Sequence, residues 1–117
     1  MNIAEVISQI YNISRAKPII KKLKIKSKQY FKQLHTIRQS FIENDYYDPC
    51  LEELTSLIYA FKVNTDAMIT HGHDMKRRKS ILDDNNQLEK YIARVIAFCK
   101  TSLYRYQLQQ IGSRHSI

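Results

Sequence analysis

Pro18–Phe41 reads PIIKKLKIKSKQYFKQLHTIRQSF, and the spacing of its apolar residues is typical of an amphipathic helix. On a helical wheel these residues fall on one arc, at intervals of three and four. They are Ile19, Ile20, Leu23, Tyr30, Phe31, Leu34, Ile37 and Phe41. The opposite arc carries Lys21, Lys24, Lys28, Lys32 and His35. The segment therefore predicts an amphipathic helix over residues 18–43 that buries its apolar arc and turns its lysines to solvent.

The N-terminal side of this segment predicts a separate, shorter helix. Isoleucine and valine recur at helical spacing over residues 2–15, which gives one apolar stripe. Pro18 is expected to begin the next helix, because proline fits a first turn, where its missing N–H leaves no hydrogen bond unmade. The lysine-rich sequence KIKSK around Ser27 is a possible break within that second helix.

The C-terminal side predicts two or three further elements. Asp48 and Pro49 are expected to start a helix that ends at Gly72, where glycine is expected to take the left-handed conformation. A short helical turn at MKRRKSIL follows, and the residues DDNN at 83–86 are expected to cap a last helix over residues 86–111. Gly112 is expected to end it.

Composition supports an all-helical protein. The 117 residues include two glycines and two prolines, too few for the tight turns of a multi-stranded β fold. The chain is long enough for one ordinary domain. We therefore expect an all-α fold, a compact bundle of four to five helices forming a single domain over residues 1–117.

The basic charge is concentrated in blocks along the chain. The formal net charge is +8, with 19 lysines and arginines against 11 acidic residues. Residues 17–43 carry a net +7, residues 44–74 a net −5 and residues 75–117 a net +6. Such an excess favours a polyanionic partner, either nucleic acid or an acidic surface. The acidic middle block is expected to pair with the chain's own basic faces or with a neighbouring subunit.

The stretch Ile69–Ile81, ITHGHDMKRRKSI, combines histidines with a run of cations. A zinc site needs three or four converging ligands, and His71, His73 and Asp74 have no matching pair elsewhere. We expect a polar hinge at Gly72 and no metal. The cations Lys76–Lys79 alone are a weak signal, but with the other basic faces they predict contacts to phosphates.

The predicted last helix carries a third basic surface. Lys90, Arg94 and Arg105 fall along one edge of its wheel, with Phe98 beside them as either a stacking ring or a margin of the core. The candidate nucleic-acid-binding residues are therefore Lys21, Lys24, Lys28, Lys32, Lys76, Arg77, Arg78, Lys79, Lys90, Arg94 and Arg105.

Other function classes have little support in the sequence. There is no glycine-rich phosphate loop, no nucleophile motif and no carboxylate pair beside a candidate acid or base, so we expect no enzyme and no cofactor. Cys50 and Cys99 lie in helical apolar patterns, which favours buried thiols over a disulfide. No apolar run suits a membrane span or a signal peptide, which predicts a cytoplasmic protein without a membrane partner.

Four segments also carry a family resemblance. IAEVISQIY, LKIKSKQYFKQLHTIRQSF, LEELTSLIYAFKV and LEKYIARVIAFCKTSLYRYQ follow one another along the chain. In this order the sequence resembles the small all-helical, Csm-type subunit of type III CRISPR effector complexes. That family often has a small residue, glycine and arginine after the middle helix, where this chain matches only at Gly72. The resemblance implies copies stacked beside a guide RNA–target duplex in a ribonucleoprotein, supplying basic side chains and no catalytic group.

Two other resemblances and a different class stay open. LEKYIARVIAFCKTSLYRYQLQQIG is also similar to the central helix of GINS replication-complex subunits, and the composition is similar to that of the basic helical accessory proteins of diversity-generating retroelements. A helical protein–protein interaction module with an acidic partner is the alternative class. The expected partners are RNA or single-stranded nucleic acid and other subunits of a complex, with further copies of the chain as an open alternative.

Overall fold

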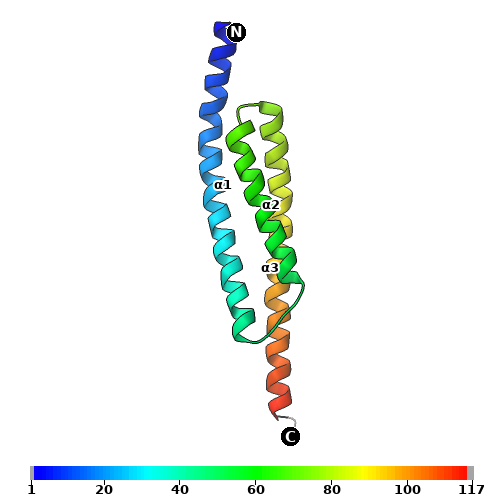
Figure 1. Ribbon diagram of the computed structural model, residues 1–117. Coiled ribbons are helices and arrows are strands. Elements are labelled where there is room, and N and C mark those ends of the chain that lie inside the picture. Colours follow the sequence, from blue (N-terminus) through cyan, green and yellow to red (C-terminus); the bar gives the residue numbers. More distant parts are fainter. Residues whose placement is uncertain (1, 116–117) are drawn as a thin grey trace.

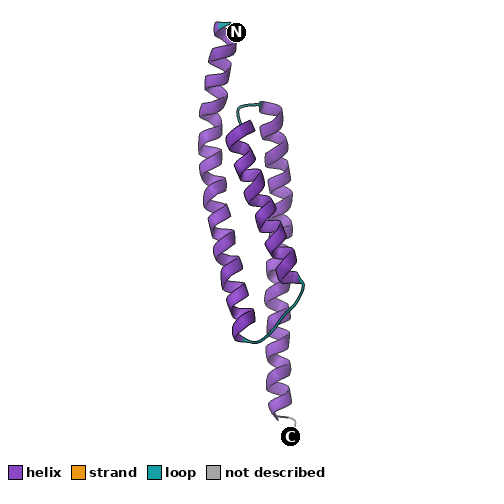
Figure 2. Cartoon of the chain, viewed as in Figure 1, coloured by secondary structure: helices purple, strands orange, loops and turns teal. Residues whose placement is uncertain are grey.

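A computed structural model describes the backbone of residues 2–115 and the side chains of residues 2–112. It contains three helices, α1 (Ile3–Glu43), α2 (Cys50–His71) and α3 (Met75–His115), and the described residues include no strand (Figures 1 and 2). α2 runs antiparallel to both long helices, as in an up-down-up arrangement (Figure 1). The all-α prediction is confirmed, whereas the expected four to five helices are wrong, because two predicted breaks do not occur.

The first missing break is at Pro18, which lies inside α1 and does not start a new helix. Proline in a helix interior loses one backbone hydrogen bond and crowds the preceding turn. Packing on both sides of Pro18 opposes that cost, since Ala16 and Leu23 are both buried. The KIKSK segment is also helical, and Ser27 is buried in it. Residues 17–27 are therefore helix.

The second missing break is at residues 83–86, which lie within α3 and do not cap a new helix. α3 begins eight residues earlier, where the Asp74 carboxylate accepts hydrogen bonds from the backbone N–H groups of Lys76 (3.0 Å) and Arg77 (3.3 Å). These bonds hold the pKa of Asp74 below its ordinary value. The predicted turn at MKRRKSIL is thus the first part of one 41-residue helix, and Gly112 does not end it.

The two connections are short and are built by named side chains. Between α1 and α2, the Asp48 carboxylate accepts a hydrogen bond of 2.8 Å from the backbone N–H of Cys50, which lowers the pKa of Asp48. Between α2 and α3, Gly72 has φ −66°, so the expected left-handed conformation is wrong. Glycine is needed there for space, because an added Cβ would overlap the carbonyl oxygen of Met68 and lie 3.3 Å from the Cβ of Ala16.

The core runs along the seam where the three helices meet. Its fully buried side chains include Phe41, Leu54, Ile58, Phe61, Met68, Ile92 and Cys99. The ring of Tyr30 packs edge-on against Phe61 with centroids 5.2 Å apart. Cys50 and Cys99 are buried free thiols with their Sγ atoms 3.0 Å apart, as the apolar pattern predicts. Burial raises the pKa of both thiols.

The molecule is elongated, which the expectation of a compact bundle missed. It measures 82 × 18 × 15 Å and has a radius of gyration of 20.1 Å, against about 13 Å for a compact domain of 100 residues. The N-terminal turns of α1 extend past the α2–α3 connection, and the C-terminal turns of α3 extend past the α1–α2 connection (Figure 1). Within the described residues, no helix is both long and apolar enough to cross a membrane.

Candidate nucleic-acid interface

A row of lysines follows one face of α1. Lys17, Lys21, Lys24, Lys28 and Lys32 are all exposed, and we call them the lysine stripe. At 100° and 1.5 Å per residue they fall within an arc of about 80° and span about 22 Å of the helix. Lys17 was not among the residues predicted from the sequence, but it belongs to the same arc. Among the described side chains no carboxylate forms an ion pair with any of the five.

The contacts of α1 show which way this stripe faces. Lys26 and Tyr30 lie on the side of α1 that meets α3. There the Oε1 atom of Glu89, a residue of α3, lies 3.0 Å from the Lys26 ammonium and accepts a 3.0 Å hydrogen bond from the Tyr30 hydroxyl. Burial raises the pKa of Tyr30 to about 12, and the hydrogen bond that Tyr30 donates to Glu89 and the negative charge of Glu89 act in the same direction. The other side is marked by Phe31, which packs on Tyr59 of α2. The lysine stripe lies on the α2 side, turned away from α3.

Tyr59 adds an aromatic ring to this face. Its ring is edge-on to Phe31 with centroids 5.1 Å apart, and 53% of the residue is exposed. An exposed ring beside a row of cations is the arrangement in which bases stack while phosphates meet ammonium groups. Sequence reasoning missed Tyr59, although a wheel of α2 would have placed it away from the core positions Leu54, Ile58 and Phe61.

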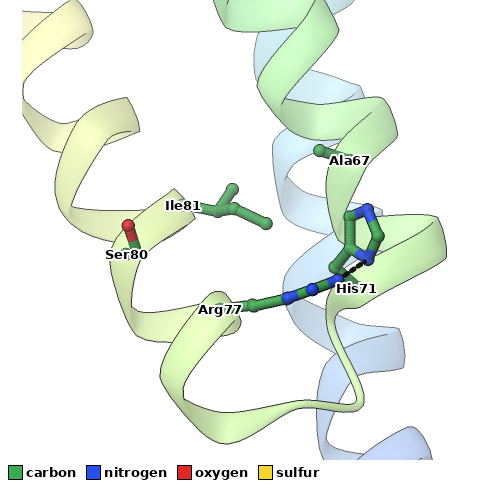
Figure 3. Close-up of a pocket in the computed structure, with 5 residues that line it drawn as sticks. All are labelled: Ala67, His71, Arg77, Ser80 and Ile81. Carbon is green, nitrogen blue, oxygen red and sulfur yellow. Dashed lines mark hydrogen bonds between the residues drawn. The ribbon is translucent and has the colours of Figure 1, made fainter.

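The cation cluster at the start of α3 is partly used inside the chain. The Arg78 guanidinium donates hydrogen bonds of 3.3 Å to the carbonyl oxygens of Asn12 and Gly72, which ties the α2–α3 connection to α1. Arg77 donates to His71 Nδ1 at 2.8 Å and lies 4.0 Å from the Asp74 carboxylate (Figure 3). Lys76 and Lys79 are exposed. Of the four cations, two therefore serve the connection between helices.

The remaining predicted cations lie on the face of α3 that points away from the other two helices. Helical geometry puts Lys90, Arg94 and Arg105 opposite the buried positions of this helix, on the face that also carries Lys76 and Lys79. The Arg94 guanidinium sits 5.9 Å from the centroid of the Tyr91 ring. Phe98 is 57% exposed, so it is not a margin of the core. Asp83 interrupts this face, whereas no acidic residue interrupts the lysine stripe.

The structure does not join the two basic surfaces. The lysine stripe faces the α2 side of α1, and the basic face of α3 points away from both other helices. A strand that follows one surface cannot reach the other without wrapping around the bundle. The eleven predicted residues are thus divided into a continuous row on α1, an interrupted row on α3 and two arginines committed to intramolecular contacts.

A shallow hollow lies next to the α2–α3 connection. It is lined by Ala67, His71, Arg77, Ser80 and Ile81 and opens to solvent (Figure 3). The His71 ring nitrogen that faces Arg77 accepts its hydrogen bond, so it is not available as a metal ligand. Within the part of the chain that the structure describes, no group of three or more His, Cys, Asp or Glu residues is placed to hold a metal ion.

No protein-family model, no curated protein and no solved structure matches this chain.

Proposed function

We propose that this protein is a non-catalytic subunit that binds the phosphate backbone of RNA or single-stranded nucleic acid. The observation that carries the proposal is the lysine stripe: five exposed ammonium groups on one face of α1, with no acidic residue between Lys17 and Lys32 and with the exposed Tyr59 ring beside it. Five cations on a rigid helix attract a polyanion without base specificity, because phosphate contacts carry no sequence information.

The sequence resemblance suggests the setting in which such binding is used. A Csm-type small subunit of a type III CRISPR effector complex is a helical, basic and non-catalytic part of a ribonucleoprotein. We propose the same role here, in the cytoplasm, with the lysine stripe along the guide or target strand. The resemblance to GINS subunits suggests a different machine and the same kind of contact.

The experiment measures the salt dependence of binding to a fluorescent single-stranded RNA. Each phosphate contact contributes about −0.7 to the slope of log affinity against log salt for a single strand. Replacing Lys21, Lys24 and Lys28 by Gln is expected to make the slope shallower by about 2 and to weaken binding to different base sequences to the same extent.

A matched control removes the same charge from other exposed positions. Lys22, Lys62 and Lys100 are exposed and lie outside the stripe, so the triple Gln variant at these positions should keep the wild-type slope. If both triple variants lost the same amount of RNA affinity and slope, the lysine stripe would have no specific role, and net charge alone would explain the binding. Failure of the wild type to bind RNA or single-stranded DNA at low salt would contradict the proposal, and would favour an acidic protein partner.

A further inference from the structure

The N-terminal turns of α1 present apolar side chains to solvent. Ile3 is 79% exposed, Ile7 61% and Ile10 59%, and Val6 and Ile13 are also exposed. Residues 2–14 contain a single charged residue, Glu5. Five aliphatic side chains on one projecting helix form a concentrated apolar face of the kind that marks an interaction surface. The described chain leaves most of this face uncovered, because these turns of α1 extend past the α2–α3 connection (Figure 1), and the face approaches α2 at Ile13, which lines a hollow with Met68 and Ile69.

Four of these five positions, all except Ile7, have a spacing that reads the same in both directions. Val6 and Ile10 lie two residues on either side of Ser8, and Ile3 and Ile13 lie five residues on either side of it. The intervals of three, four and three are those of alternating core positions in a coiled coil. A helix with such a palindromic pattern meets an identical antiparallel helix with matching side chains at every layer, which is the requirement for a two-fold symmetric interface.

We propose that two copies of the protein pair through this segment, with their α1 helices antiparallel. Each Ile3 then faces the partner's Ile13, and each Val6 faces the partner's Ile10. The four layers so formed contain only aliphatic side chains, and no charge is buried between them. The four paired positions lie between Ile3 and Ile13, one turn before Lys17, where the lysine stripe begins.

The bundle leaves room for the partner helix in this register. The bond from Arg78 to the Asn12 carbonyl marks the point on α1 where the α2–α3 connection begins to cover it. The partner's described helix starts at its Ile3, opposite Ile13, so it stops where that cover begins. A shallow hollow between α1 and α2 lies at this point. Its lining is mostly apolar, and Lys17 and His73 complete it; the apolar residues are Ile13, Ala16, Ile20, Met68 and Ile69. The partner's Ile3 is positioned to fill it.

The other projecting end of the molecule fits this face less well. The C-terminal turns of α3 expose Tyr104, Leu108 and Ile111, and the next position is Gly112. Among the described side chains beyond Gln107, which donates a hydrogen bond to Asn44 in the α1–α2 connection, the apolar ones are Leu108 and Ile111. Two apolar positions cannot cover the four layers of the α1 segment. A second α1 is therefore the occupant with the better match.

The experiment tests both the association and its direction. Chains carrying Val6→Cys or Ile10→Cys are mixed in a glutathione redox buffer and analysed on a non-reducing gel. Because the native Cys50 and Cys99 are buried, each variant adds one accessible thiol. The antiparallel register places residue 6 opposite the partner's residue 10, so the mixture should cross-link strongly. Either variant alone should cross-link weakly, because two identical positions are separated by about 6 Å along the axis.

Sedimentation equilibrium of the unmodified chain gives the second measurement. The wild type should form a dimer and nothing larger, and Ile10→Glu should weaken it by at least about tenfold, because it would bury a charge in an apolar layer. The control Val63→Glu changes a residue that is 64% exposed on α2 and should leave the dimer intact. A monomer at all concentrations up to submillimolar, growth beyond the dimer, or stronger cross-linking of the single variants than of the mixture would each overturn the proposal.

Discussion

A substitution at Tyr59 tests whether bases stack beside the lysine stripe. Replacing Tyr59 by Leu keeps an apolar contact for Phe31 and removes the exposed ring. Loss of one stacked base costs about 1–3 kcal/mol, so affinity for single-stranded RNA should fall at least about fivefold. The slope against salt should not change, because no charge is removed. Fluorescence anisotropy across a salt series measures both quantities.

A tyrosine elsewhere on the surface provides the control for this substitution. Tyr47 is 62% exposed in the connection between α1 and α2, away from the stripe, and Tyr47→Leu should bind like the wild type. An unchanged affinity for Tyr59→Leu would mean that binding uses phosphates alone. A changed salt slope in that variant would mean that the ring positions lysines instead of stacking on bases.

Asn85 is a second residue with a measurable consequence. It is 2% exposed on α3, and neither its Oδ1 nor its Nδ2 has a hydrogen-bond partner among the described residues. A buried amide without partners costs about 1–3 kcal/mol. Asn85→Leu should therefore raise the free energy of unfolding by about 1–2 kcal/mol, measured by chemical denaturation. The exposed neighbour Asn86→Leu should change it by less than about 0.5 kcal/mol. A loss of stability in Asn85→Leu would show that the amide holds a buried water.

These residue positions also show what the sequence could reveal. The apolar arc over residues 18–43 placed Leu34, Ile37 and Phe41 in the core, and all three are buried, because burial follows the period of a helix. Neither Asn85 nor Tyr59 could be placed in this way. A polar residue on the buried face was interpreted as a helix cap, and the surroundings of an exposed ring depend on which helix lies next to it.

Among the three helices, α1 contains a proline, Pro18, in its interior, where it lowers the stability of the helix. Pro18 is exposed inside a continuous helix, where proline costs about 3 kcal/mol relative to alanine. Pro18→Ala should restore one backbone hydrogen bond and raise the free energy of unfolding by about 2–3 kcal/mol. Chemical denaturation followed by circular dichroism measures this change. Lys22→Ala, at another exposed interior position of α1, should alter stability by less than about 0.5 kcal/mol. Equal stability of Pro18→Ala and the wild type would show that α1 already bends around the proline without cost.

The missing helix breaks have a common physical cause. Local preference favoured a helix boundary at Pro18 and at the run of Asp and Asn over residues 83–86. Proline does disfavour a helix interior, and Asp and Asn do favour the first position before a helix. Continuous packing on α2 outweighed them, since Ala16 and Leu23 are buried around the first site, and Asn85 within the second site and Ile92 beyond it are buried. Contacts between helices distant in sequence cannot be obtained from a one-dimensional pattern, so the sequence predicted helical segments correctly and their joining incorrectly.

At the scale of the whole molecule, the length of the bundle separates the basic surfaces. The lysines of α1 and the cations of α3 were grouped in the sequence because each set forms a basic surface on a predicted helical segment. Only the arrangement of the helices shows that these faces point in different directions. The same arrangement leaves the N-terminal turns of α1 without a partner inside the chain, although their apolar stripe predicted burial in a bundle.

The projecting turns of α1 should therefore add length without adding stability to the single chain. Removing residues 2–10 deletes no buried side chain. In a two-state unfolding experiment at low micromolar concentration, the truncated chain should melt within about 2 °C of the full chain, since a loss of 1 kcal/mol would lower Tm by roughly 4–8 °C in a domain of this size. Leu54→Ala, at a fully buried position, should cost about 2–5 kcal/mol and serves as the sensitive control.

The dependence of Tm on protein concentration distinguishes the contribution of this segment to the single chain from its contribution to the dimer. If α1 pairs with a second copy, the Tm of the full chain should rise with protein concentration, because association stabilises the folded state by mass action. The Tm of the truncated chain should stay constant. A large drop in Tm on truncation at low concentration would mean that the N-terminal turns fold back on their own bundle in solution, and it would contradict the elongated monomer on which the pairing depends.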